Sequence, residues 1–144
     1  MQSRNRSCFV VDNLSAYQRS ECMRRVTGAN TSPEILVRKL IHSMGYRYAL
    51  HVKRLPGKPD IVLVSRRKVI FVHGCFWHNH RCRRGRRLPI TNSKYWKEKR
   101  QRNADRDRRH TRCLRDEGWQ VLVIWECWTR DEEALRKKLQ AFLQ

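Results

Sequence analysis

The chain has no stretch of about eighteen consecutive apolar residues, the minimum for a transmembrane helix, and no charged-then-apolar leader precedes its body. The first absence argues against a membrane protein and the second against secretion. No internal repeat is present, and 144 residues suffice for one domain with its own core. We therefore expect a soluble, intracellular protein with a loosely held arm at residues 1–15 and a single domain over residues 16–144.

Acidic residues are scarce. The chain has 13 Asp and Glu against 33 Lys and Arg, and its formal net charge is +20. This excess is larger than solubility requires and is typical of proteins that bind polyanions, most often nucleic acid. A ribosomal-type protein or a protein that binds anionic membranes would carry the same excess, so charge alone leaves both open.

The six cysteines do not indicate a disulfide framework, because the chain is neither short nor visibly secreted. They favour reduced, metal-binding use. The segment VIFVHGCFWHNHRC, from Val69 to Cys82, concentrates histidine and cysteine. Its first five residues predict a buried strand, which Gly74 ends, and Phe76 and Trp77 in the following loop are expected to be exposed.

This loop predicts a zinc site. Cys75, His80 and Cys82 supply two thiolates and an imidazole, and Cys127, after the strand-like run VLVIWE, is the best candidate for the fourth ligand. Such a site would fasten the loop to a distant strand, as structural zinc does. The alternative is that Cys75 and Cys127 are small buried hydrophobic residues and that the histidines are solvated.

Periodicity and capping signals predict the other elements. Gly28 would end a short basic helix at Ala16–Val26, and Ser32, Pro33 and Glu34 start a helix that Gly45 ends. The remaining expected elements are strands at Tyr46–His51 and Asp60–Val64, a hairpin into Val69–His73, a long charged helix over 94–117, the most clearly buried strand at Trp119–Trp125, and a helix at Asp131–Leu143. The order predicts an α/β or α+β layer fold with helices against a mixed sheet.

The long helix is nearly all charged, which indicates a solvated face or, in so basic a chain, a face along a phosphate backbone. Asp60 opens a buried strand directly after a turn and lies near the end of the strand that carries His73. A carboxylate there is a natural Mg²⁺ ligand, although it could simply hydrogen-bond the turn. With Mg²⁺ and one or two histidines it could hydrolyse a phosphodiester, and His78 is the better base because His80 is assigned to zinc.

Several motifs together resemble the very short patch repair (Vsr) endonucleases. These are LPGKPD (Leu55 to Asp60), VIFVHGCFWHNHRC, WEC (Trp125 to Cys127), SPEILVRKL and NADRDRR (Asn103 to Arg109). The resemblance implies a restriction-endonuclease-like core and a nick 5′ of the thymine in the T·G mismatch that deamination of 5-methylcytosine leaves. It further implies a bacterial, cytoplasmic protein on the nucleoid, a monomer, with DNA repair proteins as candidate partners.

By position, the resemblance implies Cys75, His80, Cys82 and Cys127 as zinc ligands and Asp60 as the magnesium ligand. His78 would activate water, His73 would be a second active-site histidine, and Glu34 would support the waters around the metal. Val72 stands where a known member has threonine, and its backbone carbonyl would still bind Mg²⁺. The residues expected to contact DNA are Met23, Phe76, Trp77, Trp96 and Asn103, the aromatics and Met23 as wedges beside the mismatch.

Two of these assignments have alternatives. Trp96 could pack its helix onto the core instead of entering DNA. The whole chain could be a zinc-stapled DNA-binding module in which Asp60 and His78 are structural, although such a module does not need a carboxylate at a strand mouth beside free histidines.

Overall fold

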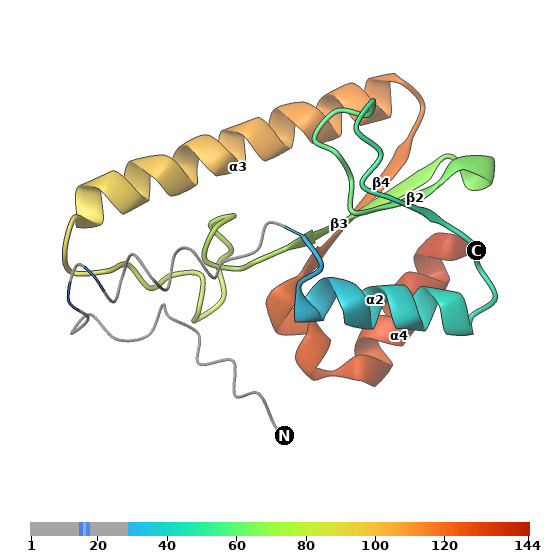
Figure 1. The fold of residues 1–144 in the computed structure, drawn as a ribbon, viewed down its shortest axis with the longest axis horizontal. Coiled ribbons are helices and arrows are strands. Elements are labelled where there is room, and N and C mark those ends of the chain that lie inside the picture. Colours follow the sequence, from blue (N-terminus) through green and yellow to red (C-terminus); the bar gives the residue numbers. More distant parts are fainter. Residues whose placement is uncertain (1–14, 16, 18–28) are drawn as a thin grey trace.

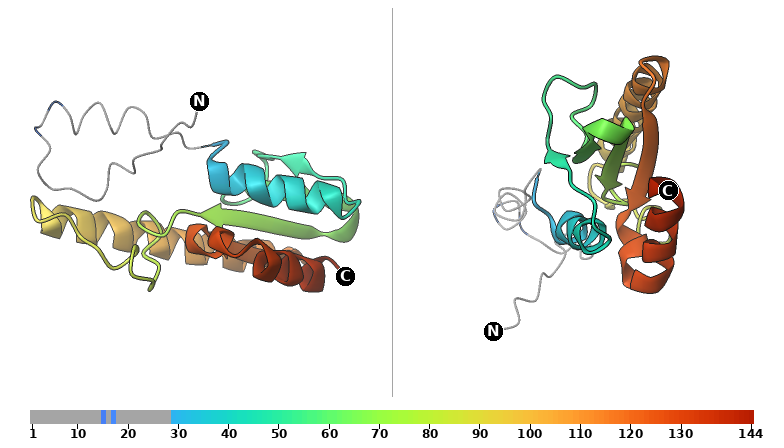
Figure 2. Two further views of the ribbon diagram at one scale, coloured as in Figure 1. Left: turned by 90° about the horizontal axis from the view of Figure 1, so that it is seen from below. Right: turned by 90° about the vertical axis from the view of Figure 1, so that its right-hand side faces the viewer.

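A computed structural model of the chain describes Ser15, Tyr17 and residues 29–144. The predicted arm, most of the predicted helix at 16–26 and the candidate wedge Met23 therefore lie outside the described residues. The described part folds in three layers (Figures 1 and 2). Helix α3 (Ser93–Asp116) covers one face of the sheet, and α2 (Ser32–Ser43) and α4 (Glu132–Leu143) cover the other.

The sheet has four strands in the order β1 (Ala49–Leu50), β2 (Ile61–Leu63), β3 (Lys68–His73) and β4 (Gln120–Trp125). β2 and β3 form the expected antiparallel hairpin, whose turn is the 3₁₀ segment Val64–Arg66 followed by Arg67 at a φ of 51°. β3 and β4 run parallel, with α3 in the connection between them. The sheet is therefore mixed, as expected.

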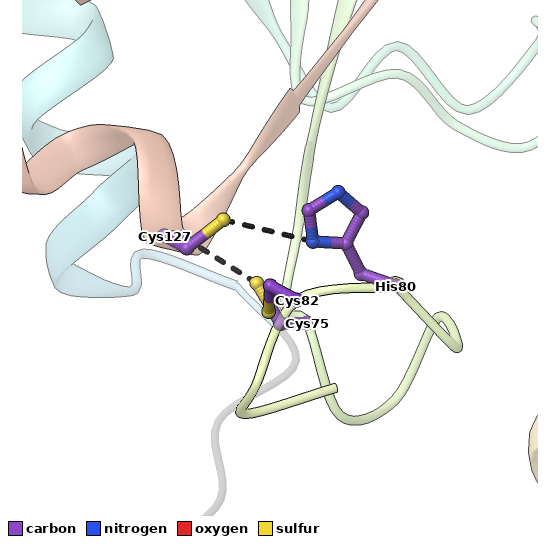
Figure 3. Close-up of side chains that lie close together, drawn as sticks. All are labelled: Cys75, His80, Cys82 and Cys127. Atoms are coloured by element: carbon purple, nitrogen blue, oxygen red, sulfur yellow. Dashed lines mark hydrogen bonds between the residues drawn. The ribbon is translucent and has the colours of Figure 1, made fainter. Parts of the chain in front are cut away.

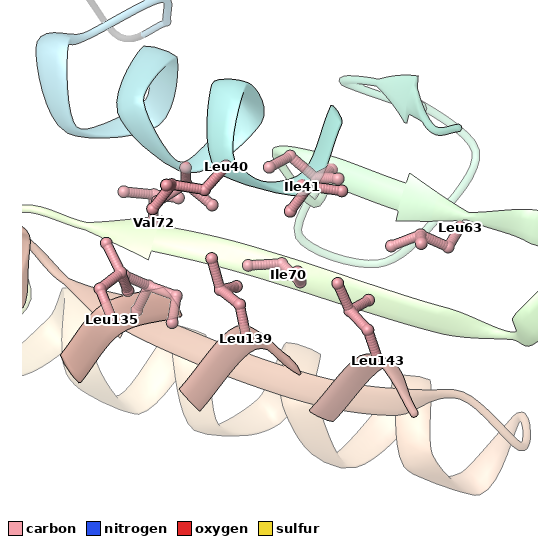
Figure 4. Close-up of a cluster of buried hydrophobic side chains, with 11 residues drawn as sticks. Leu40, Ile41, Leu63, Ile70, Val72, Leu135, Leu139 and Leu143 are labelled. Atoms are coloured by element: carbon pink, nitrogen blue, oxygen red, sulfur yellow. The ribbon is translucent and has the colours of Figure 1, made fainter. Parts of the chain in front are cut away.

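Leucine, isoleucine and valine fill the layer between the sheet and the pair α2 and α4 (Figure 4). Leu40 and Ile41 of α2 meet Ile70 and Val72 of β3, while Leu135, Leu139 and Leu143 reach them from successive turns of α4. Burial of one such side chain stabilises the fold by about 1.5–3 kcal/mol. On the opposite face, Phe71 packs with Leu114 of α3 and with Trp119. Consecutive residues of β3 thus point into different layers.

Three expectations about these elements were wrong in part. β4 is not the most buried strand, because it lies at the edge of the sheet and only Ile124 within it is buried, whereas all six residues of β3 are. The strand expected at Tyr46–His51 is reduced to two residues. Thr31, not Ser32, is the N-cap residue of α2.

In the described part of the chain, no helix is both long and apolar enough to cross a membrane.

Candidate functional site

The four predicted zinc ligands meet at one end of β3 and β4 (Figure 3). Their ligand atoms all lie within 4.8 Å of one another. The parallel register explains this, because His73 lies opposite Trp125 and the two cysteines follow two residues later on each strand. Strand pairing thus brings Cys75 and Cys127 together although they lie far apart in the sequence.

The geometry of this cluster fits a tetrahedral zinc ion. Bonds of about 2.3 Å to sulfur and 2.0 Å to nitrogen would separate the two atoms by about 3.5 Å. The Cys127 Sγ to His80 Nδ1 distance is 3.6 Å. Backbone N–H groups of Cys127 and Gly85 donate to the sulfurs of Cys75 (3.4 Å) and Cys82 (3.3 Å). These N–H groups favour thiolates, the form in which cysteine binds metal, although burial outweighs this effect at Cys75 and raises the pKa of its thiol to about 12.

Gly85 is needed for the loop to close around this cluster. A Cβ atom there would lie 2.0 Å from the carbonyl oxygen of His80. The ring of His80 stacks on Trp125, with centroids 4.2 Å apart. Both contacts fix the imidazole that faces the sulfurs.

A second cluster joins His73, His78 and Asp107 on the α3 side of the sheet. His73 is buried and its ring stacks on that of His78, with centroids 3.8 Å apart. His78 Nδ1 lies 2.5 Å from Asp107 Oδ2. Because Nδ1 is engaged by a carboxylate, Nε2 is the nitrogen that remains to accept a proton.

Burial and nearby charges shift the pKa values of His73 and Asp107. Burial, with the nearby His78, lowers the pKa of His73 to about 3, so its imidazole is neutral at ordinary pH. Burial alone would raise the pKa of Asp107, but the hydrogen bond and charge of His78 lower it below its usual value. Asp107 is therefore an ionised partner for His78.

Asp60 lies at the start of β2, where its Oδ2 accepts a hydrogen bond of 2.7 Å from Val72 N–H. The contact brings the carboxylate to the backbone of the residue expected to share the magnesium ion. Burial raises the pKa of Asp60 to about 6, and Glu34 adds to the effect, while the Val72 N–H opposes it. A carboxylate oxygen is a ligand type that suits Mg²⁺.

Glu34 is buried at the start of α2. Its Oε2 accepts from Asn30 N–H (3.0 Å) and from Arg38 Nη2 (3.1 Å), and its Oε1 accepts from the Thr31 hydroxyl (3.2 Å). Glu34 thus ties Asn30 and Thr31, directly before α2, to the first turn of that helix, and its charge also acts on Asp60. His51 lies between the two carboxylates, 3.9 Å from an oxygen of each.

The aromatic residues form one group at the start of α3. Phe76 contacts both Trp77 and Trp96, with centroids 5.2 and 5.9 Å away. Phe76 is only 6% exposed, so the expectation that it stands free in the loop was wrong, while Trp77 and Trp96 are half-buried. The Arg100 guanidinium lies over the Phe76 ring and donates to loop carbonyls, which explains its burial. Asn103 donates to Trp77 O (3.1 Å).

A groove of about 880 Å³ lies between α3 and β4 and opens onto the His73 cluster. Among the residues that line it are Arg81, Arg108, Arg112 and Arg115. The charged helix therefore presents part of its basic surface to the groove that His78 also lines.

A sequence model of the family described as DNA mismatch endonuclease Vsr matches residues 11–84. The chain belongs to the Vsr family. The type II nicking enzyme V.XorIIP of Xanthomonas oryzae pv. oryzae is 49% identical over 134 residues, which span 93% of this chain and 98% of the relative. The DNA mismatch endonuclease Vsr of Escherichia coli is 38% identical over 130 residues, 87% of this chain and 83% of the relative.

Among solved structures, the catalytic domain of the homing endonuclease I-Bth0305I is similar to this chain with a TM-score of 0.56 and 20% identity. The similarity covers 78% of this chain and 94% of that domain. It confirms the restriction-endonuclease-like α/β fold. Together with membership of the Vsr family, it identifies the chain as a DNA endonuclease.

Sequence reasoning missed three residues of the site. Asp107 was present in the NADRDRR run that fits the Vsr family, but no role was assigned to it. Arg38 was likewise present in the SPEILVRKL motif without an assigned role, and His51 lay in no motif. Helical spacing places Arg38 beside Glu34, four residues away on one helix, but gives no position for His51.

Proposed function

We propose that this Vsr-family endonuclease nicks double-stranded DNA 5′ of the thymine in a T·G mismatch by Mg²⁺-dependent hydrolysis. The observation that carries the proposal is the arrangement around the end of β3. The Asp60 carboxylate contacts Val72, and the His78–Asp107 pair contacts His73, the next residue of the strand. The proposed metal ligand and the proposed general base each contact one of two adjacent residues of β3, which supports their acting in one site.

In this proposal Asp60 and the Val72 carbonyl would hold the magnesium ion, and Glu34 would support its waters. When bound, Mg²⁺ supplies positive charge against the phosphate oxygens. His78 Nε2 takes the proton of the attacking water, because Asp107 holds Nδ1 and stabilises the imidazolium that forms. His73, neutral and buried, can donate one hydrogen bond to the scissile phosphate without adding a buried charge.

The Cys75, His80, Cys82 and Cys127 cluster is proposed to hold structural zinc. Four protein ligands leave no open position for substrate, which is typical of structural zinc sites. The ion would fasten the loop that carries His78 to the end of β4. Zinc then supports catalysis only by holding His78 in place.

Mismatch selection is assigned to the aromatic group. Two half-buried tryptophans, Trp77 and Trp96, would wedge into the duplex where a mispaired step opens most easily. Phe76 packs against both of them. Met23, which lies outside the described residues, is proposed as a further wedge. Asn103 would contact DNA or brace Trp77 through the hydrogen bond that it already makes. The basic groove would hold the phosphate backbone. We further propose that the protein acts as a monomer on nucleoid DNA, with DNA repair proteins as partners.

A strand-specific nicking assay tests this function. Two duplexes that differ only in T·G or T·A at one position are labelled on either strand and incubated with protein and Mg²⁺. We expect one cut, directly 5′ of the mismatched thymine, and little cutting of the T·A duplex. Equal cutting of both duplexes, or cutting of both strands, would reject mismatch nicking while leaving nuclease activity in place.

A further inference from the structure

Two side chains that the proposed chemistry does not use lie between its two carboxylates. Arg38 extends from α2 and His51 follows β1, so they come from different elements. Arg38 Nη2 lies 3.1 Å from His51 Nε2 and 3.1 Å from Glu34 Oε2. His51 Nδ1, on the far side of the ring, lies 3.9 Å from Asp60 Oδ1. A continuous chain of contacts thus runs from Glu34 to Asp60.

Arg38 is placed too deeply to be an ordinary surface arginine. Its side chain is 13% exposed, and Glu34, its ion-pair partner, is 4% exposed. Its second terminal nitrogen, Nη1, donates to Asn30 Oδ1 at 2.8 Å. The planar fork therefore holds the carboxylate and the loop before α2 together, which a single ammonium group could not do.

The contact with Arg38 also decides how His51 is oriented. A guanidinium can only donate hydrogen bonds, so His51 Nε2 must accept for this contact to be favourable. The proton of the neutral ring then lies on Nδ1, the nitrogen nearest Asp60. The Nδ1–H of His51 is then the group nearest to Asp60 Oδ1, at 3.9 Å, which is longer than a hydrogen bond but close enough for an electrostatic contact, while Val72 N–H donates to Asp60 Oδ2.

We propose that Arg38 and His51 act together as a positioning pair for the magnesium site. Arg38 fixes Glu34 and the tautomer of His51, and His51 fixes the rotation of the Asp60 carboxylate. Partners of metal ligands commonly change metal affinity by about 10–100-fold when they are removed. This inference rests on the proposed function, because it assumes that Asp60 holds the catalytic metal.

The test measures metal binding as well as nicking. Mn²⁺, which is paramagnetic, is titrated against zinc-loaded protein and followed by electron paramagnetic resonance, and the Mg²⁺ concentration for half-maximal nicking of the T·G duplex is determined. We expect His51→Ala to lower the affinity for Mn²⁺ and to raise the Mg²⁺ concentration for half-maximal nicking, each by about tenfold or more. His51→Gln should stay within about threefold of wild type, because its amide can accept from Arg38 and donate to Asp60.

Arg38→Lys keeps the charge but loses the fork, and we expect it to weaken Mn²⁺ binding about as much as His51→Ala. The variant with both substitutions should bind Mn²⁺ no more weakly than the single variant that binds it more weakly, because the two side chains act as one unit. His42→Ala, at an exposed position of α2, and Arg136→Ala, at an exposed position of α4, are the matched controls and should behave as wild type.

The outcomes separate the two ideas. If wild-type protein fails to nick with Mg²⁺, the proposed function fails. If wild type nicks but His51→Ala keeps its Mg²⁺ half-saturation and Mn²⁺ affinity, or if the effects of the two variants multiply, the positioning pair is wrong and the proposed function stands. A purely structural role for His51 would lower the melting temperature and leave both metal readouts unchanged.

Discussion

Two regions of the molecule offer metal ligands in opposite ways. The zinc corner, formed by Cys75, His80, Cys82 and Cys127, takes three of its ligands from eight consecutive residues of one loop. The carboxylate corner, formed by Glu34, Arg38, His51 and Asp60, takes its four side chains from α2, from the segment after β1 and from the start of β2. The first is assembled mainly by the local chain and the second only by the tertiary fold.

The difference has an energetic consequence. The zinc corner has four donors that one ion could satisfy completely, so the proposed zinc would contribute folding free energy there. In the carboxylate corner two buried acids face each other, and burial raises the pKa of Asp60 to about 6. In the absence of the proposed magnesium ion, ionisation of Asp60 therefore destabilises the fold, which is common where a site is built for a ligand. Substitutions in the two corners should therefore have different effects.

The largest expected effect is on catalysis in the carboxylate corner. Asp60→Ala removes the proposed magnesium ligand and should slow single-turnover nicking of the T·G duplex about a thousandfold or more. Binding of the duplex and zinc content should remain, because neither depends on this carboxylate. Asp105→Ala, at a partly exposed position of α3, is the control. A rate within tenfold of wild type would remove Asp60 from the metal site.

His78 lies on the loop of the zinc corner but is expected to act in catalysis. His78→Ala should slow nicking by about a hundredfold to ten-thousandfold, the usual contribution of a positioned base. Asp107→Asn should cost less, because it leaves His78 in place but removes its ionised partner. Near-normal single-turnover rates in His78→Ala would transfer the role of base to His73 or to a metal-associated water.

Asp60→Asn should stabilise the magnesium-free protein, with a dependence on pH. The folded-state pKa of about 6 exceeds the usual 3.8, so ionisation of Asp60 destabilises the fold as pH rises above about 4. The difference corresponds to at most about 3 kcal/mol at pH 8. Asparagine can still accept from Val72 N–H but carries no charge. The excess of the variant's unfolding free energy over that of the wild type should therefore shrink as the pH falls from 8 to 5. Urea unfolding at both pH values measures it, and a gain independent of pH would contradict the cause.

The smallest expected effect concerns selectivity. Trp77→Ala should lower the preference for T·G over T·A by about tenfold, since a lost wedge costs on the order of 1 kcal/mol of selective binding. The slope of affinity against salt should stay the same, because phosphate contacts are retained. Replacing Arg83 and Arg86, both exposed in the loop, by neutral residues should instead lower the affinity for both duplexes and flatten the dependence on salt. Undiminished T·G preference in Trp77→Ala would exclude the wedge.

Sequence patterns predicted most of the fold, because helix starts and apolar periodicity are local signals. Pro33 and Glu34 placed α2, and Asp131 is the N-cap of α4, where its side chain accepts from Ala134 N–H. Ligand type and spacing also brought Cys127 to the right cluster. The burial of β4 was misjudged because an apolar run does not reveal that a strand lies at the edge of its sheet.

The missed site residues depend on contacts between distant segments. Asp107 meets His78 only because α3 crosses the end of β3, 29 residues along the chain. His51 was expected to end the strand Tyr46–His51, but it follows the two-residue β1 with a φ of 46°, so the strand pattern did not predict its contacts with Glu34 and Asp60. Phe76 looked exposed because its loop is polar, yet Arg100 and Trp96 cover it. Tertiary packing, not local sequence, decided each of these.

One measurement tests most directly the claim that the two corners hold different metals with different roles. Protein purified with zinc is freed of loosely held metal by a chelator too weak to remove zinc, and its circular dichroism, zinc content and T·G nicking are recorded before and after Mg²⁺ is added. We predict one zinc per chain, an unchanged fold, no nicking without Mg²⁺ and a nick 5′ of the thymine with it. Nicking at full rate without Mg²⁺, or a folded, active protein without zinc, would contradict the account.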